Sequence, residues 1–148
     1  MATGSQINDW IENMANVADM NADTLKIALS NTAPASETSD PRSDNNGVLA
    51  NVTEISYTNY SDDMTVDRTL ESITSTQTSG TWTLDAANIV ITASGGALAT
   101  FRYIYFYDDT PTSPADPLIA VFDHGSAITL ASAQTATITV NATGIMTI

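Results

Sequence analysis

Short segments in which apolar and polar side chains alternate constrain the fold of this chain more than any other feature of its sequence. In the segment TLKIALS, residues 24–30, the apolar residues Leu25, Ile27 and Leu29 are separated by single residues of the opposite face. Further segments rich in Thr, Ile, Val or aromatic residues follow at short spacing, at 68–77, 81–93, 97–108, 117–125, 126–130 and 133–148. A period of two is that of a half-buried β-strand, and short strands divided by turn-forming residues are typical of all-β folds. We therefore predict an all-β domain, an antiparallel β-sandwich or barrel of about eight strands with one N-terminal amphipathic helix.

The N-terminal segment, residues 5–20, has the spacing of that helix. Its apolar side chains recur three and four positions apart, which places them on one helical face. They are Ile7, Trp10, Ile11, Met14, Val17 and Ala18. Ser5 is suited to cap the first turn and Asn21 to end the helix. The apolar face packs either on the sheet of the same chain or on a neighbouring subunit, and the second alternative makes Ile7 and Trp10 candidate partner contacts.

One domain accounts for the length of 148 residues, because a chain of this size buries a single core. We predict one β domain over residues 1–148, in which residues 51–148 form a β core that the strand at 24–30 completes.

A long segment of turn formers separates that strand from the rest of the core. Residues 31–50, NTAPASETSDPRSDNNGVLA, form a loop longer than compact domains usually contain without a functional reason. The loop is either an arm that reaches over a neighbouring subunit or a flexible surface flap. The first alternative makes Pro34, Pro41 and Arg42 candidate partner contacts.

Acidic residues dominate the charge of the chain. Asp and Glu number 17 against 4 Lys and Arg, which gives a net charge of −13. The basic residues Lys26, Arg42, Arg68 and Arg102 are too few and too scattered to neutralise phosphates, so we predict no nucleic-acid binding. We interpret the acidity as a source of solubility rather than as a calcium site or a site of acid-specific recognition.

The sequence predicts no membrane partner and synthesis in the cytoplasm. No apolar run approaches the roughly 18 residues of a membrane span, and the start, MATGSQINDW, lacks the basic and apolar regions of a secretory signal. The absence of cysteine excludes disulfides, thiolate metal sites and cysteine nucleophiles.

The aromatic segment FRYIYFYD, residues 101–108, is predicted to be a central strand, because both of its faces are apolar. We expect Phe101 to share one face with the row Tyr103, Tyr105 and Tyr107. A row of tyrosines also suits a sugar-binding platform, but a sheet core or a subunit interface is the favoured interpretation.

The only candidates for catalytic or metal chemistry are Asp108, Asp109, Asp116, Asp123 and His124. Zinc needs further nitrogen or sulfur ligands, and calcium needs six or more oxygens in fixed geometry. Ser126 lacks the G-x-S-x-G setting of a hydrolase nucleophile. We therefore predict no catalytic residue, no metal, no cofactor and no enzymatic activity.

Two features near these acids are interpreted as backbone structure. The tripeptide at 123–125 is predicted to be a turn that closes a strand at 117–122, with Gly125 in a conformation that other residues avoid. Residues 108–117, DDTPTSPADP, have the composition of an exposed connection. That connection supplies the candidate partner contacts Asp109, Pro111 and Pro114.

Three segments resemble a family of small virion proteins of tailed bacteriophages. They are NDWIENMANVADMNADTLKIALSNTAP, TSGTWTLDAANIVITASGGALATFRYIYFYDDTP and DPLIAVFDHGSAITLASAQTATITVNATGIMTI. The resemblance covers nearly the whole chain except residues 31–50, where the family tends to have a shorter loop. Its motifs are patterns of strands and turns rather than catalytic signatures.

The resemblance implies a capsid decoration, or cement, protein. Such a protein is typically a homotrimer on the outer capsid surface that binds and stabilises junctions of the major capsid protein, after assembly in the host cytoplasm. Its contacts are expected on the N-terminal segment and the loops at 31–50 and 108–117. The alternatives are a neck, tail or fibre component of the virion, or a glycan- or receptor-binding β-module.

Overall fold

The computed structural model describes residues 3–141 and 143–147, and in these ranges antiparallel strand is the predominant regular structure. The strands are β1 (Thr3–Gln6), β2 (Leu25–Ser30), β3 (Tyr60–Asp62), β4 (Thr74–Thr78), β5 (Thr81–Asp85), β6 (Ile89–Ala93), β7 (Phe101–Asp108), β8 (Leu118–Ile128), β9 (Thr135–Ile138) and β10 (Met146–Thr147). One short helix, α1 (Trp10–Asn16), follows β1 in the described part of the chain, and two 3-10 turns, Pro34–Ser36 and Leu49–Asn51, lie between β2 and β3. The all-β class is thereby confirmed.

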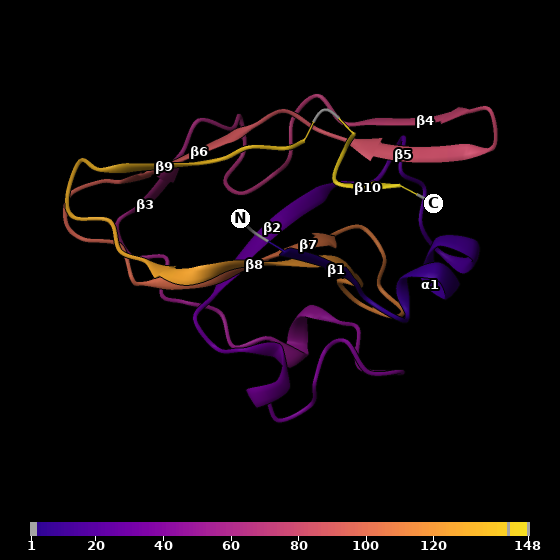
Figure 1. Cartoon of the computed structure of the whole chain (residues 1–148), viewed down its shortest axis with the longest axis horizontal. Helices are drawn as coiled ribbons and strands as arrows, with labels where there is room; N and C mark the ends of the chain where they lie inside the picture. Colours follow the sequence, from indigo (N-terminus) through magenta and orange to yellow (C-terminus); the bar gives the residue numbers. More distant parts are fainter. Residues whose placement is uncertain (1–2, 142, 148) are drawn as a thin grey trace.

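The strands form three antiparallel sheets, with the orders β1-β8-β7-β2, β10-β5-β4 and β3-β6-β9. Figure 1 shows the two three-stranded sheets in one upper layer above the four-stranded sheet, with the segment between β2 and β3 below it. The sheets stack as an open sandwich and do not close into a barrel in the described residues. The four-stranded sheet is therefore covered on both faces.

Strand β7 is central, as predicted for the aromatic segment. It pairs with β2 on one side and with β8 on the other, and Arg102 alone among its described side chains is not buried. Ile104 and Phe106 point toward the upper layer. The opposite side, which we call the tyrosine face, points toward the segment between β2 and β3 and carries Tyr103, Tyr105 and Tyr107. Two covered faces explain why both sets of alternate side chains are large and apolar or aromatic.

Strand β8 contains a bulge where the sequence predicted a turn. The tripeptide at 123–125 does not end a strand, because β8 continues through it, but its glycine has the expected left-handed angle, with φ 89°. Opposite the bulge, Tyr103 pairs with Asp123 whereas Phe101 pairs with Ile128. At this interruption of the ladder Phe101 lies on the side of the upper layer, where it lines the same groove as Ile104 and Phe106. The prediction that it shares a face with the tyrosines is therefore wrong.

The helix predicted over residues 5–20 is shorter than expected. Its first part is strand β1, in which Ser5 pairs with Val121 of β8 instead of capping a helix. Pairing with β1 satisfies the backbone groups that β8 otherwise leaves open at the edge of the sheet. Gly4 permits the pairing, because a Cβ atom there would lie 2.6 Å from the ring of Phe122.

The apolar stripe of this segment packs on the chain itself. Ile7 and Trp10 are fully buried, whereas Ile11 is 56% exposed and does not belong to the packed face. In the described residues no helix is long and apolar enough to cross a bilayer.

Candidate functional site

The segment between β2 and β3 forms an ordered layer over the tyrosine face, which differs from both a free arm and a flexible flap. Pro34 and Pro41 are buried in it. The carboxylate of Asp9 accepts the backbone N–H groups of Asn45 and Gly47, each at 2.9 Å. Buried rings and charge-assisted hydrogen bonds offset the entropy lost on ordering a segment so rich in turn formers.

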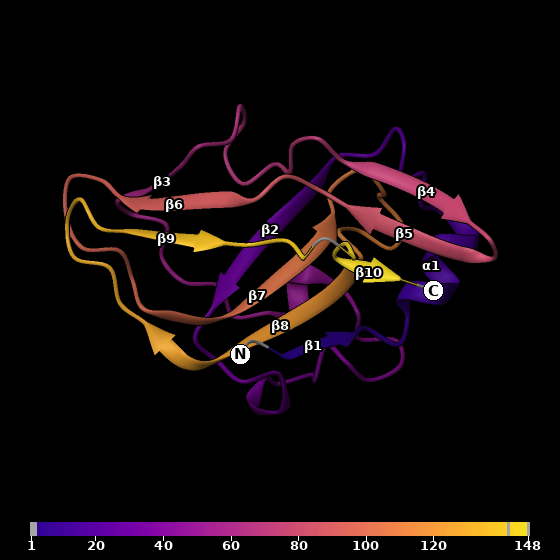
Figure 2. The same ribbon diagram turned by 45° about the horizontal axis from the view of Figure 1, so that its top comes forward.

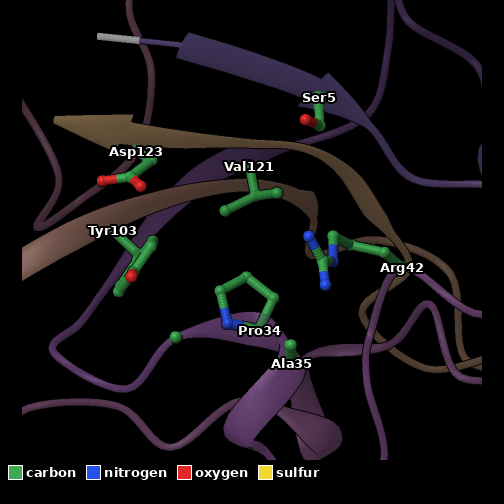
Figure 3. A pocket seen from close by; sticks show the side chains of 8 residues that line it. Ser5, Pro34, Ala35, Arg42, Tyr103, Val121 and Asp123 are labelled. Atoms are coloured by element: carbon green, nitrogen blue, oxygen red, sulfur yellow. The ribbon is translucent and has the colours of Figure 1, made fainter. Parts of the chain in front are cut away.

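A small pocket lies between this layer and the sheet (Figure 3). Its volume is about 200 Å³, and its lining is Ser5, Ala33, Pro34, Ala35, Arg42, Tyr103, Val121 and Asp123. Arg42 donates to Asp40 at 3.0 and 2.7 Å, and Arg102 donates to Asp123 at 2.7 and 2.8 Å. The volume is below the roughly 300 Å³ at which small-molecule sites begin.

The charged side chains around the pocket form ion pairs with one another, Arg42 with Asp40 and Arg102 with Asp123. Hydrogen bonds from Arg102 lower the pKa of Asp123 to about 2, with a smaller contribution from the N–H of Gly125. Hydrogen bonds from Arg42 likewise lower the pKa of Asp40. We therefore assign no charged ligand to this pocket.

The tyrosine row is covered rather than displayed. Tyr103, Tyr105 and Tyr107 are 7%, 0% and 3% exposed, and burial raises the pKa of Tyr107 to about 12. A sugar-binding platform needs solvent-exposed aromatic faces, so these rings do not form one in this structure.

Tyr105→Phe is expected to stabilise the chain by about 1 kcal/mol, because the buried Tyr105 hydroxyl has no hydrogen-bond partner in the described residues. Tyr57→Phe is the matched control, since the Tyr57 hydroxyl donates to Glu54 at 2.6 Å and accepts the N–H of Leu29 at 2.8 Å. Removal of the Tyr57 hydroxyl is expected to lower the free energy of unfolding by about 1–3 kcal/mol. Urea unfolding of both variants measures the two changes, and equal destabilisation would contradict the difference in hydrogen bonding.

The three residues that a catalytic cleft would need do not converge. Asp109 follows the end of β7, whereas Asp123 pairs with Tyr103 near its start, so about 20 Å of strand separates them at the usual rise per residue. Asp109 forms an ion pair with Lys26 at 2.7 Å. His124 Nδ1 lies 2.9 Å from a backbone oxygen two residues later. In residues 3–141 and 143–147 no group of three His, Asp or Glu side chains is arranged to hold a metal ion.

Two carboxyl groups meet at the end of β7. Asp108 is fully buried, and one of its oxygens accepts the N–H of Thr110 at 3.1 Å while the other has no donor in the described residues. Burial, followed by the hydrogen-bonding and charge of Asp23 beside it, raises the pKa of Asp108 to about 7. Below neutral pH the Asp108 carboxyl therefore keeps its proton in the folded chain.

Sequence reasoning missed this carboxyl pair. The pairing of Leu25 with Asp108 in the β2–β7 ladder brings Asp23 close. The sequence does carry a signal for the pair, since Asp108 ends the aromatic segment 101–108 and Asp23 directly precedes the apolar segment 24–30.

A larger groove opens between β7 and β8 on one side and β9 on the other. Its volume is about 600 Å³, within the range of binding clefts. Apolar side chains dominate its lining, among them Phe101, Ile104, Phe106, Phe122, Ile128 and Ile138. Sequence reasoning missed the groove, because no local pattern indicates that β9 and β8 lie opposite one another without filling the space between them.

The candidate partner contacts divide into two groups. Ile7, Trp10, Pro34 and Pro41 are buried against the chain itself, so they offer no surface to a partner in this structure. Arg42 and Pro111 are half-buried, and Asp109 and Pro114 are exposed.

Comparison of the chain with protein-family models, curated proteins and solved structures finds no match in any of the three.

Proposed function

We propose that this chain is a structural protein of a tailed-bacteriophage particle, and that within the particle it is a capsid decoration protein that binds the major capsid protein on the outside of the head. The family resemblance of the sequence supplies the class of particle. Binding rather than catalysis agrees with the described residues, whose acids and lone histidine do not gather in one cleft.

One observation carries the proposal: the three segments expected to make contacts lie together. Asp9, just before α1, holds the segment between β2 and β3 through two backbone N–H groups. The same segment joins the connection from β7 to β8, where the N–H of Leu49 donates to the oxygen of Asp116 at 3.0 Å and Val48 forms a β-bridge with Pro117. The N-terminal segment, the segment between β2 and β3 and the connection from β7 to β8 therefore form one continuous surface, which we call the loop surface.

The chemistry of the loop surface favours a basic partner. Its exposed positions include the acid Asp44, the acid Asp109, which is paired with Lys26, and the uncharged residues Ser113, Pro114 and Ala115. Electrostatic complementarity of this kind speeds association and fixes orientation, and it weakens with added salt.

The first test is the copy number of the chain in purified particles, measured by quantitative mass spectrometry against the major capsid protein. A ratio near one to one supports the decoration role. A ratio far below that assigns the chain to the neck, tail or fibre, and absence from the particle overturns the virion proposal.

The second part of the test uses particles that lack the chain. Asp44→Lys is expected to weaken binding about tenfold, because it places a positive charge against a basic partner surface. Asp67→Lys makes the same charge change at a side chain that is 66% exposed in the connection between β3 and β4, away from the loop surface. Equal weakening by the two variants would show that net charge, and not the loop surface, controls binding.

A further inference from the structure

Strand β9 leaves one edge of the upper layer open. Among the strands that the structure describes, it has a neighbour on one side only, in the order β3-β6-β9. In an antiparallel ladder every second residue turns its N–H and C=O away from the paired strand, so half of the backbone groups of β9 point to the free edge.

The apolar groove opens beside this free edge. The groove is lined by β9 itself, and Phe122, Ile128 and Ile138 in its lining are only half-buried. Unpaired backbone groups give affinity to an added strand, and neighbouring apolar pockets take its side chains. The groove and the edge thus have the two properties of a strand-binding surface.

The segments nearest the groove and the free edge of β9 contain no Asp, Glu, Lys or Arg. The acids of the same sheet, Asp62 and Asp63, lie across β6 from that edge, at the end of β3, where Asp63 accepts the N–H of Val90 at 2.7 Å. All 17 acidic and 4 basic residues lie outside 86–101 and 124–148. These segments include β6, β9 and the turns before β7 and β9, which a hydrogen bond of 3.0 Å from Leu98 N–H to Leu130 O joins (Figure 2). Exposed residues there are small or uncharged, among them Ser94, Gly95, Ala131, Ser132, Gln134 and Thr135.

The distribution of charge indicates which kind of partner can bind at the groove and the free edge of β9. Each copy of the chain carries a net charge of −13, so two copies repel one another across their acidic surfaces. Repulsion is smallest where both copies present the edge of β9, which carries no charged side chain. A basic partner, in contrast, gains nothing from a surface without acids and is attracted to the loop surface instead.

We infer that the groove and the free edge of β9 are the surface through which one copy of the chain binds a second copy. The strand laid along β9 is the β9 of the second copy, because antiparallel pairing of identical edges is self-complementary and gives a closed two-fold contact. This contact joins two three-stranded sheets across the mouth of both grooves and covers their half-buried apolar side chains. The inference does not depend on the virion proposal, and it is tested on the purified chain alone.

The test is the molar mass of the full chain by light scattering over a range of concentrations. The wild type is expected to exceed the monomer mass as its concentration rises. Thr135→Asp with Thr137→Asp places acids of both copies against each other at exposed positions of β9, and is expected to weaken association about a hundredfold. A wild type that stays monomeric, or a variant that associates as well as the wild type, would overturn the inference.

Thr76→Asp with Thr78→Asp is the matched control. It adds the same charge to exposed threonines of another edge strand, β4, at the opposite end of the upper layer (Figure 1). It is expected to leave association unchanged, and equal dissociation would overturn the assignment to β9. Hydrogen exchange of the wild type gives a readout that needs no variant: the amides of 134–140 are expected to gain protection with concentration, and protection gained only elsewhere would contradict the inference.

Discussion

Deleting residues 33–47 is expected to unfold the chain rather than to leave a stable domain without a loop. These residues supply the buried Pro34, Pro41 and Gly47 of the layer over the tyrosine face. Without them Tyr103 and Tyr105, now 7% and 0% exposed, lose their cover. Full burial of a large side chain contributes about 1.5–3 kcal/mol, so the loss approaches the roughly 5–15 kcal/mol of a typical domain.

Circular dichroism melting and binding of a hydrophobic dye measure this effect. The deletion variant is expected to lose its cooperative transition and to bind the dye. The control exchanges Thr38 and Ser43, two exposed residues of the same segment, for Ala, and is expected to change stability by less than about 0.5 kcal/mol. Cooperative melting of the deletion variant near the wild-type temperature would contradict the layer described above.

Capsid binding by the deletion variant does not test the proposed contacts. Loss of binding by a deletion variant would report unfolding, not a lost contact. A single exposed charge such as Asp44 separates the two, because its exchange leaves the buried prolines in place.

The period-two pattern predicted individual strands well but not the sheets to which they belong. Strand β2 lies within the predicted segment 24–30, and β7 is the predicted central strand. The segment 81–93, in contrast, was interpreted as one strand and is two, β5 and β6, in different sheets. Alternation reports which face of a strand is buried, and it carries no information about which neighbour provides the cover.

Strand β1 and the layer over the tyrosine face were missed for a related reason. Residues 3–6, TGSQ, contain no apolar alternation, and they form a strand because β8 offers an unpaired edge. Residues 31–50 lack apolar periodicity, yet Pro34 and Pro41 pack as the apolar groups of the layer. Structure induced by a neighbouring element leaves little trace in local sequence.

Asp108→Asn is expected to make the chain more stable than the wild type at pH 8, and equally stable near pH 4. The pKa of Asp108 is raised from 3.8 to about 7 in the folded chain, chiefly by burial and then by Asp23. The folded wild type therefore keeps a proton that the unfolded chain releases, and its stability falls as the pH rises from about 4 to about 7. Above pH 7 Asp108 is ionised in the folded chain too, and the full cost of burying its charge lowers the free energy of unfolding. A pKa shift of this size corresponds to about 4 kcal/mol.

Asparagine is suited to this position because it carries no charge and retains both contacts. Its oxygen can accept the N–H of Thr110, and its NH₂ group can donate toward the carboxylate of Asp23 beside it. Denaturant unfolding at several pH values measures the difference, with Asp67→Asn as the control at a side chain that is 66% exposed. A stability difference that is the same at pH 5 and pH 8, or an Asp108→Asn variant less stable than the wild type at pH 8, would contradict a raised pKa of the buried Asp108 carboxyl. The expected outcome is that the stability of Asp108→Asn relative to the wild type increases with pH between these values. Only the wild type has a carboxyl at this position to ionise, and burial and the nearby Asp23 both oppose that ionisation.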